Sequence, residues 1–150
     1  MDSKMETKSI GNYEEVGFEA MALIREVIKE CTEIGELNRI NIKYLFATKP
    51  RNSKGRVILG SAKLCPEKDA FLHDYKGVVI FDKETWECQP EYRKPLILHE
   101  LSHFAVDPET GNLLSVDHDI TEFYAVYKRY GDWQGQIKLI EMKQLELNLV

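Results

Sequence analysis

The sequence predicts an α+β fold in which helices pack against a small, mostly antiparallel sheet of about three strands. Apolar residues recur every three or four positions near the N-terminus, short β-branched and aromatic segments occupy the middle, and a second helical pattern begins near Pro95. The chain has 150 residues, of which 43% are hydrophobic and 30% are charged. This size and composition are typical of one globular unit, so we expect a single domain over residues 1–150.

The first expected element is an amphipathic helix over residues 13–33. Its apolar residues follow the spacing of one helix face, and they are Val16, Ala20, Leu23, Ile24, Val27, Ile28 and Cys31. Asn12 is the expected N-cap, and Glu14 and Glu15 suit the positive end of the helix dipole. The polar residues 1–11 before the helix are expected to form a flexible leader.

The strands are expected in the middle of the chain. Residues 40–46 and 56–60 are rich in β-branched and aromatic side chains, and the polar residues 49–55 separate them. This pattern predicts two strands joined by an exposed basic loop. Residues 77–81 form a short, continuously apolar run bounded by turn-forming residues, which is typical of a strand buried on both faces.

The second half of the chain predicts two further helices. One begins near Pro95, since proline is tolerated in a first turn, and continues to about residue 106, where an Asp-Pro pair ends it. A loop over residues 107–116 leads to Asp117, the expected N-cap of a helix that stops near Gly131. The apolar pattern of the tail fits either a strand or a helix.

The first of these helices carries His99, Glu100 and His103 in a His-Glu-x-x-His spacing. Residues four apart lie on one helix face with Cβ atoms about 6 Å apart, so the two imidazoles can bind one zinc ion. Glu100 is rotated by about 100° from His99, which places it beside the metal as a general base for a metal-bound water. The competing interpretation is a helix on which two histidines share a face without a metal.

A catalytic zinc site normally has three protein ligands and leaves a fourth position for water, so a third ligand is expected. His118 lies fifteen residues after His103, far enough for a loop to bring it back to the metal. We expect His118 to be the third ligand, because neutral imidazole suits a histidine-rich zinc site. Glu122, one turn later, is the alternative ligand; otherwise it would orient a ligand ring.

Residues 86–133 resemble known metallopeptidases. The elements His-Glu-Leu-x-His at 99–103, His-Asp-x-x-Glu-Phe at 118–123 and Arg-Tyr-Gly at 129–131 resemble the Putative phage metallopeptidase family. The spacing of the third histidine resembles that of the SprT-like zincins. In those proteins a glycine follows the third histidine, whereas Asp119 stands at that position here.

This resemblance implies a fold, a cofactor and a reaction. It implies a zincin-like fold that binds zinc through His99, His103 and His118, with Glu100 as the catalytic acid and base. The reaction would be hydrolysis of a peptide or protein substrate by a metal-activated water, from which Glu100 takes a proton that it passes to the leaving amine.

Such a site also needs a surface that binds the peptide and a donor that stabilises the intermediate. The strand at 77–81 can offer an edge on which an extended peptide adds as another strand. The tetrahedral intermediate needs an additional donor, and the residue types suited to it near the motif are Tyr124, Tyr127, Tyr130 and His73. None of these four is assigned to that role.

Charge is unevenly distributed along the chain. The net charge is −5, yet residues 37–66 contain seven Lys and Arg and no Asp or Glu, so this stretch is +7 and the remainder is −12. The basic segment 39–63 fits a solvated hairpin that opposes edge-to-edge pairing, or a contact with nucleic acid. The second candidate function is a catalytically silent, zinc-stabilised binding module, which this segment would associate with nucleic acid. The intact Glu100 weighs against it, because a purely structural site has no use for a base.

Two classes of protein are excluded by the sequence. No apolar run approaches the roughly 20 residues that cross a bilayer, so no membrane partner is expected. Residues 1–8 are charged and polar where a secretory signal would be apolar, so we expect a cytoplasmic protein.

Overall fold

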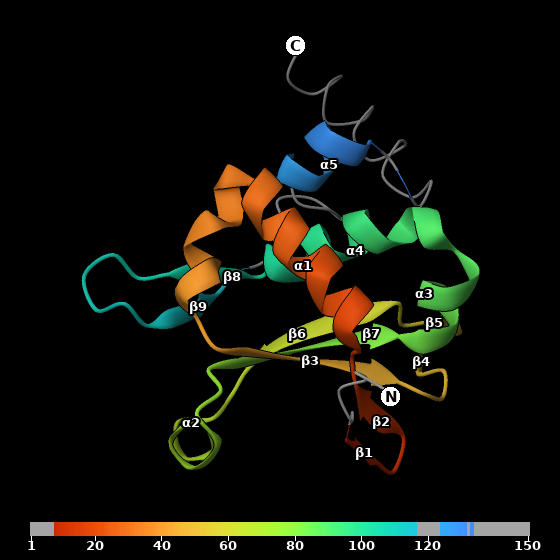
Figure 1. The fold of residues 1–150 in the computed structure, drawn as a ribbon, viewed down its shortest axis with the longest axis horizontal. Coiled ribbons are helices and arrows are strands. Elements are labelled where there is room, and N and C mark those ends of the chain that lie inside the picture. The colour runs from red at the N-terminus through yellow and green to blue at the C-terminus, as the bar shows by residue number, and fades with distance from the viewer. Residues whose placement is uncertain (1–7, 117–123, 132, 134–150) are drawn as a thin grey trace, which may run out of the picture.

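The computed structural model describes residues 8–116, 124–131 and 133, and Figure 1 shows a sheet with most of the helices on one face. The strands are β1 (Ser9–Ile10), β2 (Tyr13–Glu15), β3 (Ile42–Ala47), β4 (Asn52–Ser53), β5 (Arg56–Val57), β6 (Gly60–Leu64), β7 (Gly77–Asp82), β8 (Phe104–Val106) and β9 (Leu113–Ser115). The α-helices are α1 (Phe18–Glu30), α2 (Glu67–His73), α3 (Lys83–Cys88), α4 (Arg93–Leu101) and α5 (Tyr124–Tyr130), and the 3₁₀-helices are η1 (Thr32–Arg39) and η2 (Pro90–Tyr92).

The main sheet has five strands in the order β1-β2-β3-β7-β6. Its two central strands, β3 and β7, are parallel, and the other neighbours are antiparallel. The mixed α+β class and the mostly antiparallel sheet are therefore confirmed. The prediction of about three strands is too low, because two very short N-terminal strands also join the sheet.

The N-terminal segment differs from the prediction. β1 and β2 form a hairpin that adds to β3, so residues 9–15 belong to the sheet rather than to a leader and a helix. Gly11 lies in the turn between them at φ 59°, a conformation that favours glycine. Helix α1 begins only at Phe18, after Gly17, and Asn12 is not its cap.

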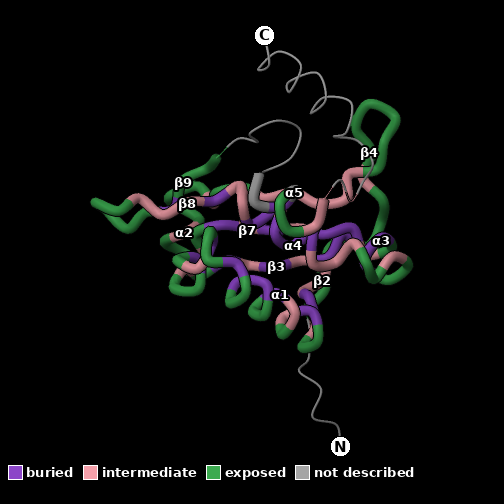
Figure 2. The backbone as a smooth tube through the Cα atoms, turned by 90° about the horizontal axis from the view of Figure 1, so that it is seen from above, coloured by how far each residue is buried: buried purple, intermediate pink, exposed green. Residues whose placement is uncertain are grey.

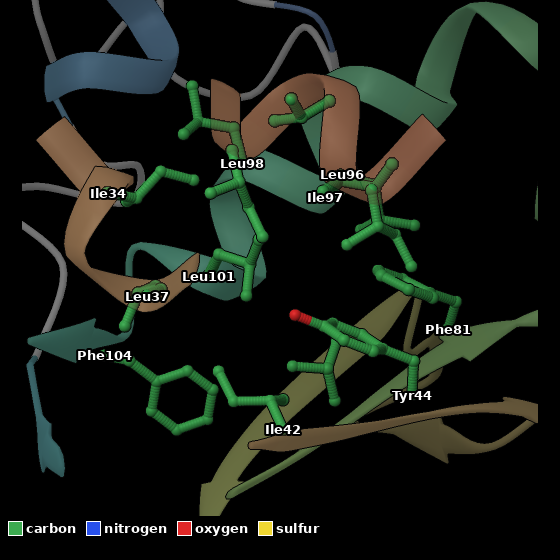
Figure 3. Packing of buried hydrophobic residues seen from close by; sticks show 14 of the residues in the cluster. Ile34, Leu37, Ile42, Tyr44, Phe81, Leu96, Ile97, Leu98, Leu101 and Phe104 are labelled. Atoms are coloured by element: carbon green, nitrogen blue, oxygen red, sulfur yellow. The ribbon is translucent and has the colours of Figure 1, made fainter. Parts of the chain in front are cut away.

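The hydrophobic core lies between the sheet and the helices α1 and α4, as Figure 3 shows at close range. The predicted stripe of α1 is buried, and its buried members are Ala20, Ile24, Val27 and Ile28. Helix α4 contributes Leu96, Ile97, Leu98 and Leu101. Burial of each large apolar side chain stabilises the fold by about 1.5–3 kcal/mol, so α4 is held firmly against the sheet.

Strand β7 is central in the sheet but is not buried on both faces. Val79 and Phe81 are fully buried in the core, whereas Val78 and Ile80 are half-buried. The latter two line a hollow of about 860 Å³ on the face of the sheet that α1 and α4 do not cover. The continuous apolar run therefore reflects a central strand with one well-packed face and one partly open face.

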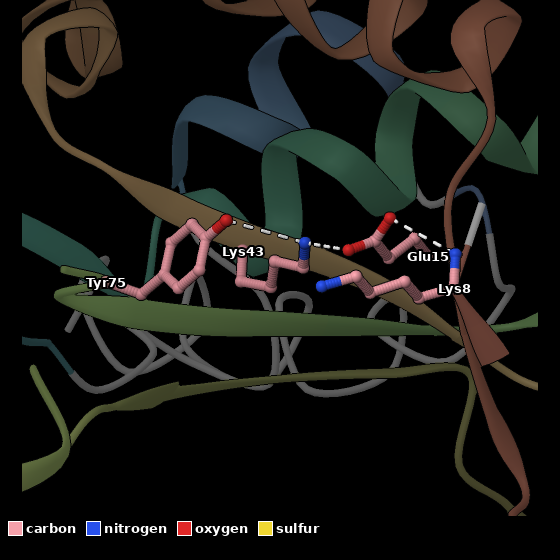
Figure 4. A network of polar contacts seen from close by, with 4 residues as sticks. All are labelled: Lys8, Glu15, Lys43 and Tyr75. Atoms are coloured by element: carbon pink, nitrogen blue, oxygen red, sulfur yellow. Dashed lines mark hydrogen bonds and ion pairs between the residues drawn. The ribbon is translucent and has the colours of Figure 1, made fainter. Parts of the chain in front are cut away.

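A small polar network lies on the partly open face, as Figure 4 shows. The Lys43 ammonium donates a hydrogen bond to Glu15 and another, at 3.5 Å, to the Tyr75 hydroxyl. The backbone N–H of Lys8 donates to the same Glu15 carboxylate at 3.3 Å. Because Glu15 lies on β2 and Lys43 on β3, the ion pair joins the N-terminal hairpin to the centre of the sheet.

The segment predicted as one strand over residues 56–60 is divided in two. β5 ends at Val57 and pairs with β4, and β6 begins at Gly60 and pairs with β7. The turn residues Lys54 and Gly55 have φ values of 52° and 77°, as a type I′ turn requires. The expected exposed basic loop is thus a short β-hairpin.

Helix α4 ends earlier than predicted, at Leu101. The backbone N–H of His103 donates to the Glu100 carbonyl at 3.2 Å, a contact three residues back that tightens the last turn. Phe104 then begins β8, which pairs with β9, so part of the predicted loop over 107–116 is also a strand. Because Phe104 is buried against the sheet, a strand at this point stabilises the fold more than another helical turn would.

The last described helix agrees with the prediction at its end. α5 stops at Tyr130, and Gly131 follows with φ 70°, a common way for a helix to end. The predicted start of this helix at Asp117 and the tail after residue 133 lie outside the described residues. Within the described part of the chain, no helix is long and apolar enough to cross a membrane.

Candidate metal centre

Helix α4 places the first two residues of the His-Glu-x-x-His motif in its last turn. His99 and Glu100 lie on the helix, and His103 follows its end. The ring centroids of His99 and His103 are 5.4 Å apart. The ligand atoms of His99, Glu100 and His103 all lie within 4.8 Å of one another. The structure therefore brings together the three motif residues that the sequence singled out.

The ring of His103 is held by the backbone of Val116. Its Nδ1 lies 3.0 Å from the Val116 carbonyl oxygen, and the Val116 N–H donates to the His103 carbonyl at 2.6 Å. A carbonyl oxygen can only accept a hydrogen bond, so Nδ1 carries the proton in this contact. In the neutral ring the lone pair then lies on Nε2, which is the state that a metal-binding histidine needs.

Glu100 is one of two buried charged residues in the described part of the chain, with 4% of its surface exposed. It packs against Gly60, the first residue of β6: a Cβ built at Gly60 would lie 2.8 Å from Glu100 Oε2 and 3.0 Å from Cγ and Cδ. Oε2 is also 3.9 Å from Nε2 of His99. The carboxylate therefore lies between the sheet and the imidazoles, in a space that is available because residue 60 has no side chain.

The donor set fits a zinc ion. Two imidazoles and a nearby carboxylate are groups that zinc prefers, and the second imidazole is fixed by a backbone carbonyl, as is common for zinc ligands. The C-terminal end of α4 also favours a cation, because the helix dipole is negative there. The expected third ligand His118 and its alternative Glu122 lie outside the described residues.

Of the four candidates for the additional donor, the structure places His73 away from this group. His73 ends α2 and lines the hollow on the open face of the sheet, away from α4. The Tyr130 hydroxyl is buried and has no hydrogen-bond partner among the described residues, and burial raises its pKa. The side chains of Tyr124 and Tyr127 lie outside the described part.

The strand that the sequence predicts as a peptide-binding edge, residues 77–81, does not lie at an edge of the sheet. β7 lies between β3 and β6, so the prediction that residues 77–81 form an exposed edge is wrong. β6 is the edge strand next to Glu100. Its first residue, Gly60, stood at the end of a predicted strand, where glycine often marks a close approach of another group. The glycine at position 60 was therefore a signal that the sequence contained. Nothing in the sequence indicated that the Val116 carbonyl would contact the His103 ring.

The fold and this group of side chains define an α+β protein with a candidate metal centre of the His-Glu-x-x-His type. Residues 12–143 match the family model described as "Putative phage metallopeptidase", and the chain belongs to this family. A comparison with the curated proteins gives no match, and neither does a comparison with the solved structures.

Proposed function

We propose that the protein is a zinc-dependent metallopeptidase with a zincin-like fold, in which Glu100 acts as general base and general acid. The observation that supports this most directly is the His99, Glu100 and His103 group, whose ligand atoms lie within 4.8 Å of one another. It occurs in a chain that belongs to a metallopeptidase family. In this proposal His118 is the third zinc ligand, and Glu122 is the alternative.

Each described residue of the site has a separate role in this proposal. His99 and His103 hold the metal, the latter through a ring that Val116 orients. When bound, zinc supplies a Lewis acid that acidifies water and polarises the scissile carbonyl. Glu100 accepts a proton from the attacking water and delivers it to the leaving amine, and its packing against Gly60 restricts the orientation of the carboxylate.

The peptide substrate is proposed to bind along β6. Among the described strands of the main sheet, β6 pairs only with β7, so its other edge can accept an extended chain. Glu100 packs against the first residue of this strand. A peptide paired with β6 would therefore have its scissile bond near Gly60, within reach of the carboxylate.

Replacement of Glu100 by glutamine tests the proposed chemistry. Glu100→Gln preserves the size of the side chain but removes the base, so we expect hydrolysis to fall by about 10²- to 10⁴-fold while zinc content stays unchanged. Hydrolysis is measured with fluorescein-labelled casein and with a mixed peptide library read by mass spectrometry. Zinc is measured in the same samples by elemental mass spectrometry.

Glu91→Gln is the matched control, since Glu91 is an exposed glutamate on η2, shortly before α4. It should leave both zinc content and hydrolysis unchanged. Undiminished hydrolysis in Glu100→Gln, with unchanged zinc, would remove Glu100 from the proposed role. Bound zinc without any Glu100-dependent hydrolysis would instead favour the alternative function, a zinc-stabilised binding module.

A further inference from the structure

The β4–β5 hairpin, residues 49–57, is the most concentrated positive charge in the described structure. It carries Lys49, Arg51, Lys54 and Arg56, and no acidic residue occurs anywhere in residues 37–66. Figure 2 shows the part labelled β4 as an exposed loop that projects from the body of the protein. We refer to residues 49–57 as the basic hairpin.

The exposed cations of the basic hairpin are not neutralised within the described structure. Three other lysines of the described structure do have acidic partners: Lys43 pairs with Glu15, Lys83 with Glu14, and Lys94 with Glu26 and Glu30. Lys49, Lys54 and Arg56 are exposed, and none of them forms an ion pair with a described residue. Their charge is therefore available to a ligand, in a chain whose net charge is −5.

The basic hairpin is attached to β6, the strand whose first residue packs against Glu100. Arg51 Nη1 donates a hydrogen bond to Ser61 Oγ at 3.2 Å on the partly open face of the sheet, which joins the hairpin to β6 one residue after Gly60. Gly60 itself packs against Glu100. Arg56 is four residues before Gly60, so their Cα atoms are at most about 14 Å apart. The exposed cations are thus held near one end of the strand along which the peptide is proposed to bind.

We propose that the basic hairpin selects peptide substrates that carry acidic residues a few positions away from the scissile bond. This inference rests on the proposed peptidase function. An extended peptide advances by about 3.3 Å per residue, so a separation of up to about 14 Å, plus the reach of the side chains, corresponds to about three to six residues. Acidic side chains at that distance from the scissile bond would lie close to Lys49, Lys54 and Arg56.

An acidic peptide fits this surface better than nucleic acid does. Proteins that bind single strands combine cations with aromatic side chains on which bases stack, and the basic hairpin contains no aromatic residue. A long polyanion would also extend over the rest of the protein and be repelled by it, because the chain without residues 37–66 has a net charge of −12. A short acidic stretch within a peptide meets the hairpin alone.

The test compares peptides that differ only in charge. One quenched fluorescent peptide has Gln at positions three to six on both sides of its central bond; two others have Glu at these positions, on the N-terminal side or on the C-terminal side. We expect one of the Glu peptides to be cleaved with a kcat/KM roughly three- to tenfold above that of the Gln peptide. Salt at about 0.5 M should abolish this preference, because it screens exposed charges.

The variant Lys54→Asn/Arg56→Gln removes two of the cations, and Asn tolerates the positive φ of residue 54. It should lose the preference for the Glu peptide while cleavage of the Gln peptide is unchanged. Arg25→Gln/Lys29→Gln is the matched control, because it removes the same two charges from exposed positions on α1. This control should retain the preference.

Binding separates this inference from the proposed function. Anisotropy of the fluorescein-labelled peptides is measured with the zinc-loaded Glu100→Gln variant, with and without the hairpin substitutions. Hairpin-dependent, salt-sensitive binding of a Glu peptide would support the inference even if the wild-type protein cleaves no peptide. The lack of cleavage by the wild type would then count only against the proposed peptidase function. Equal cleavage and equal binding of Glu and Gln peptides would overturn the inference. Hairpin-dependent binding of a labelled single-stranded oligonucleotide, without a preference for Glu peptides, would overturn it in favour of nucleic acid.

Discussion

The candidate site depends on two residues that contribute no side-chain chemistry. The backbone carbonyl of Val116 orients His103, and the absence of a Cβ at Gly60 leaves room for Glu100. Neither position belongs to the His-Glu-x-x-His motif, although both determine how its side chains are presented. At this scale, small changes in the supporting residues should affect catalysis without removing any of the reacting groups.

Gly60→Ala tests whether Gly60 positions Glu100. The new Cβ would lie 2.8 Å from Glu100 Oε2, so the carboxylate must move. Because a displacement of about 1 Å in a catalytic group can cost up to 10²-fold, we expect kcat to fall roughly ten- to hundredfold. Zinc content should not change, since His99 and His103 are not displaced by this methyl group. Peptide hydrolysis and elemental mass spectrometry are the measurements.

Two further variants separate positioning from a general loss of structure. Gly35→Ala is the control, because a Cβ there meets nothing within 4 Å, and it should be fully active. Glu100→Asp shortens the side chain by one methylene, so Gly60→Ala/Glu100→Asp should be more active than the product of the two single effects predicts. A Gly60→Ala enzyme with wild-type kcat would show that Gly60 does not position the base.

At the scale of elements, long segments with a clear apolar pattern were predicted well. The buried face of α1, the central strand β7 and the end of α5 before Gly131 all followed from periodicity and turn residues. The short strands were not predictable in the same way. β1, β2, β8 and β9 have two or three residues each, and their stability comes from partners distant in the sequence rather than from their own pattern.

The early end of α4 matters most for the site. A helix continued to residue 106 would carry the chain past the position where β8 and β9 now pair. Their pairing brings Val116 back to His103 and so orients the His103 ring. This contact was not predicted, because residues 104–106 fit the pattern of a continued helix in the sequence. Tertiary burial of Phe104 outweighs local helix propensity at this point.

The ion pair between β2 and β3 predicts a pH dependence of stability. The hydrogen bond from Lys43, together with the Lys8 N–H, lowers the pKa of Glu15 below its usual 4.5 despite some burial. The contribution of the Glu15–Lys43 ion pair to stability is therefore complete above about pH 4.5 and is lost as the pH falls through the lowered pKa of Glu15. Lys43→Met should reduce the free energy of unfolding by about 0.5 to 1 kcal/mol at pH 7, and by less at pH 3.

This prediction is checked by urea unfolding of the metal-free protein at both pH values. Lys63→Met is the control, because Lys63 is an exposed lysine on β6 without an ion pair in the described structure. Its effect should not depend on pH. An effect of Lys43→Met that is equal at pH 3 and pH 7 would contradict the stabilising role of the pair.

At the scale of the whole molecule, the positive charge and the candidate site lie at the same edge of the sheet. The sequence indicated both features, but it did not indicate that they are neighbours, because Gly60 and Glu100 are forty residues apart. The metal motif was predictable since it is local, five residues at the C-terminal end of α4, whereas the proximity of the basic hairpin depends on the register of β6 with β7. A single domain over residues 1–150 stays a prediction.

The proposed function depends on a zinc centre built on His99 and His103, and the zinc content of the purified protein shows whether this centre exists. Elemental mass spectrometry is applied to protein purified without an affinity tag, as wild type, His103→Ala, His118→Ala and Glu122→Ala, with the exposed His73→Ala as control. We predict about one zinc ion per chain in the wild type and in the His73 and Glu122 variants, and loss of zinc in the His103 and His118 variants. Loss of zinc in Glu122→Ala but not in His118→Ala would identify Glu122 as the third ligand in place of His118. A wild-type protein that holds no zinc, even after zinc is offered and the excess removed, would contradict the account.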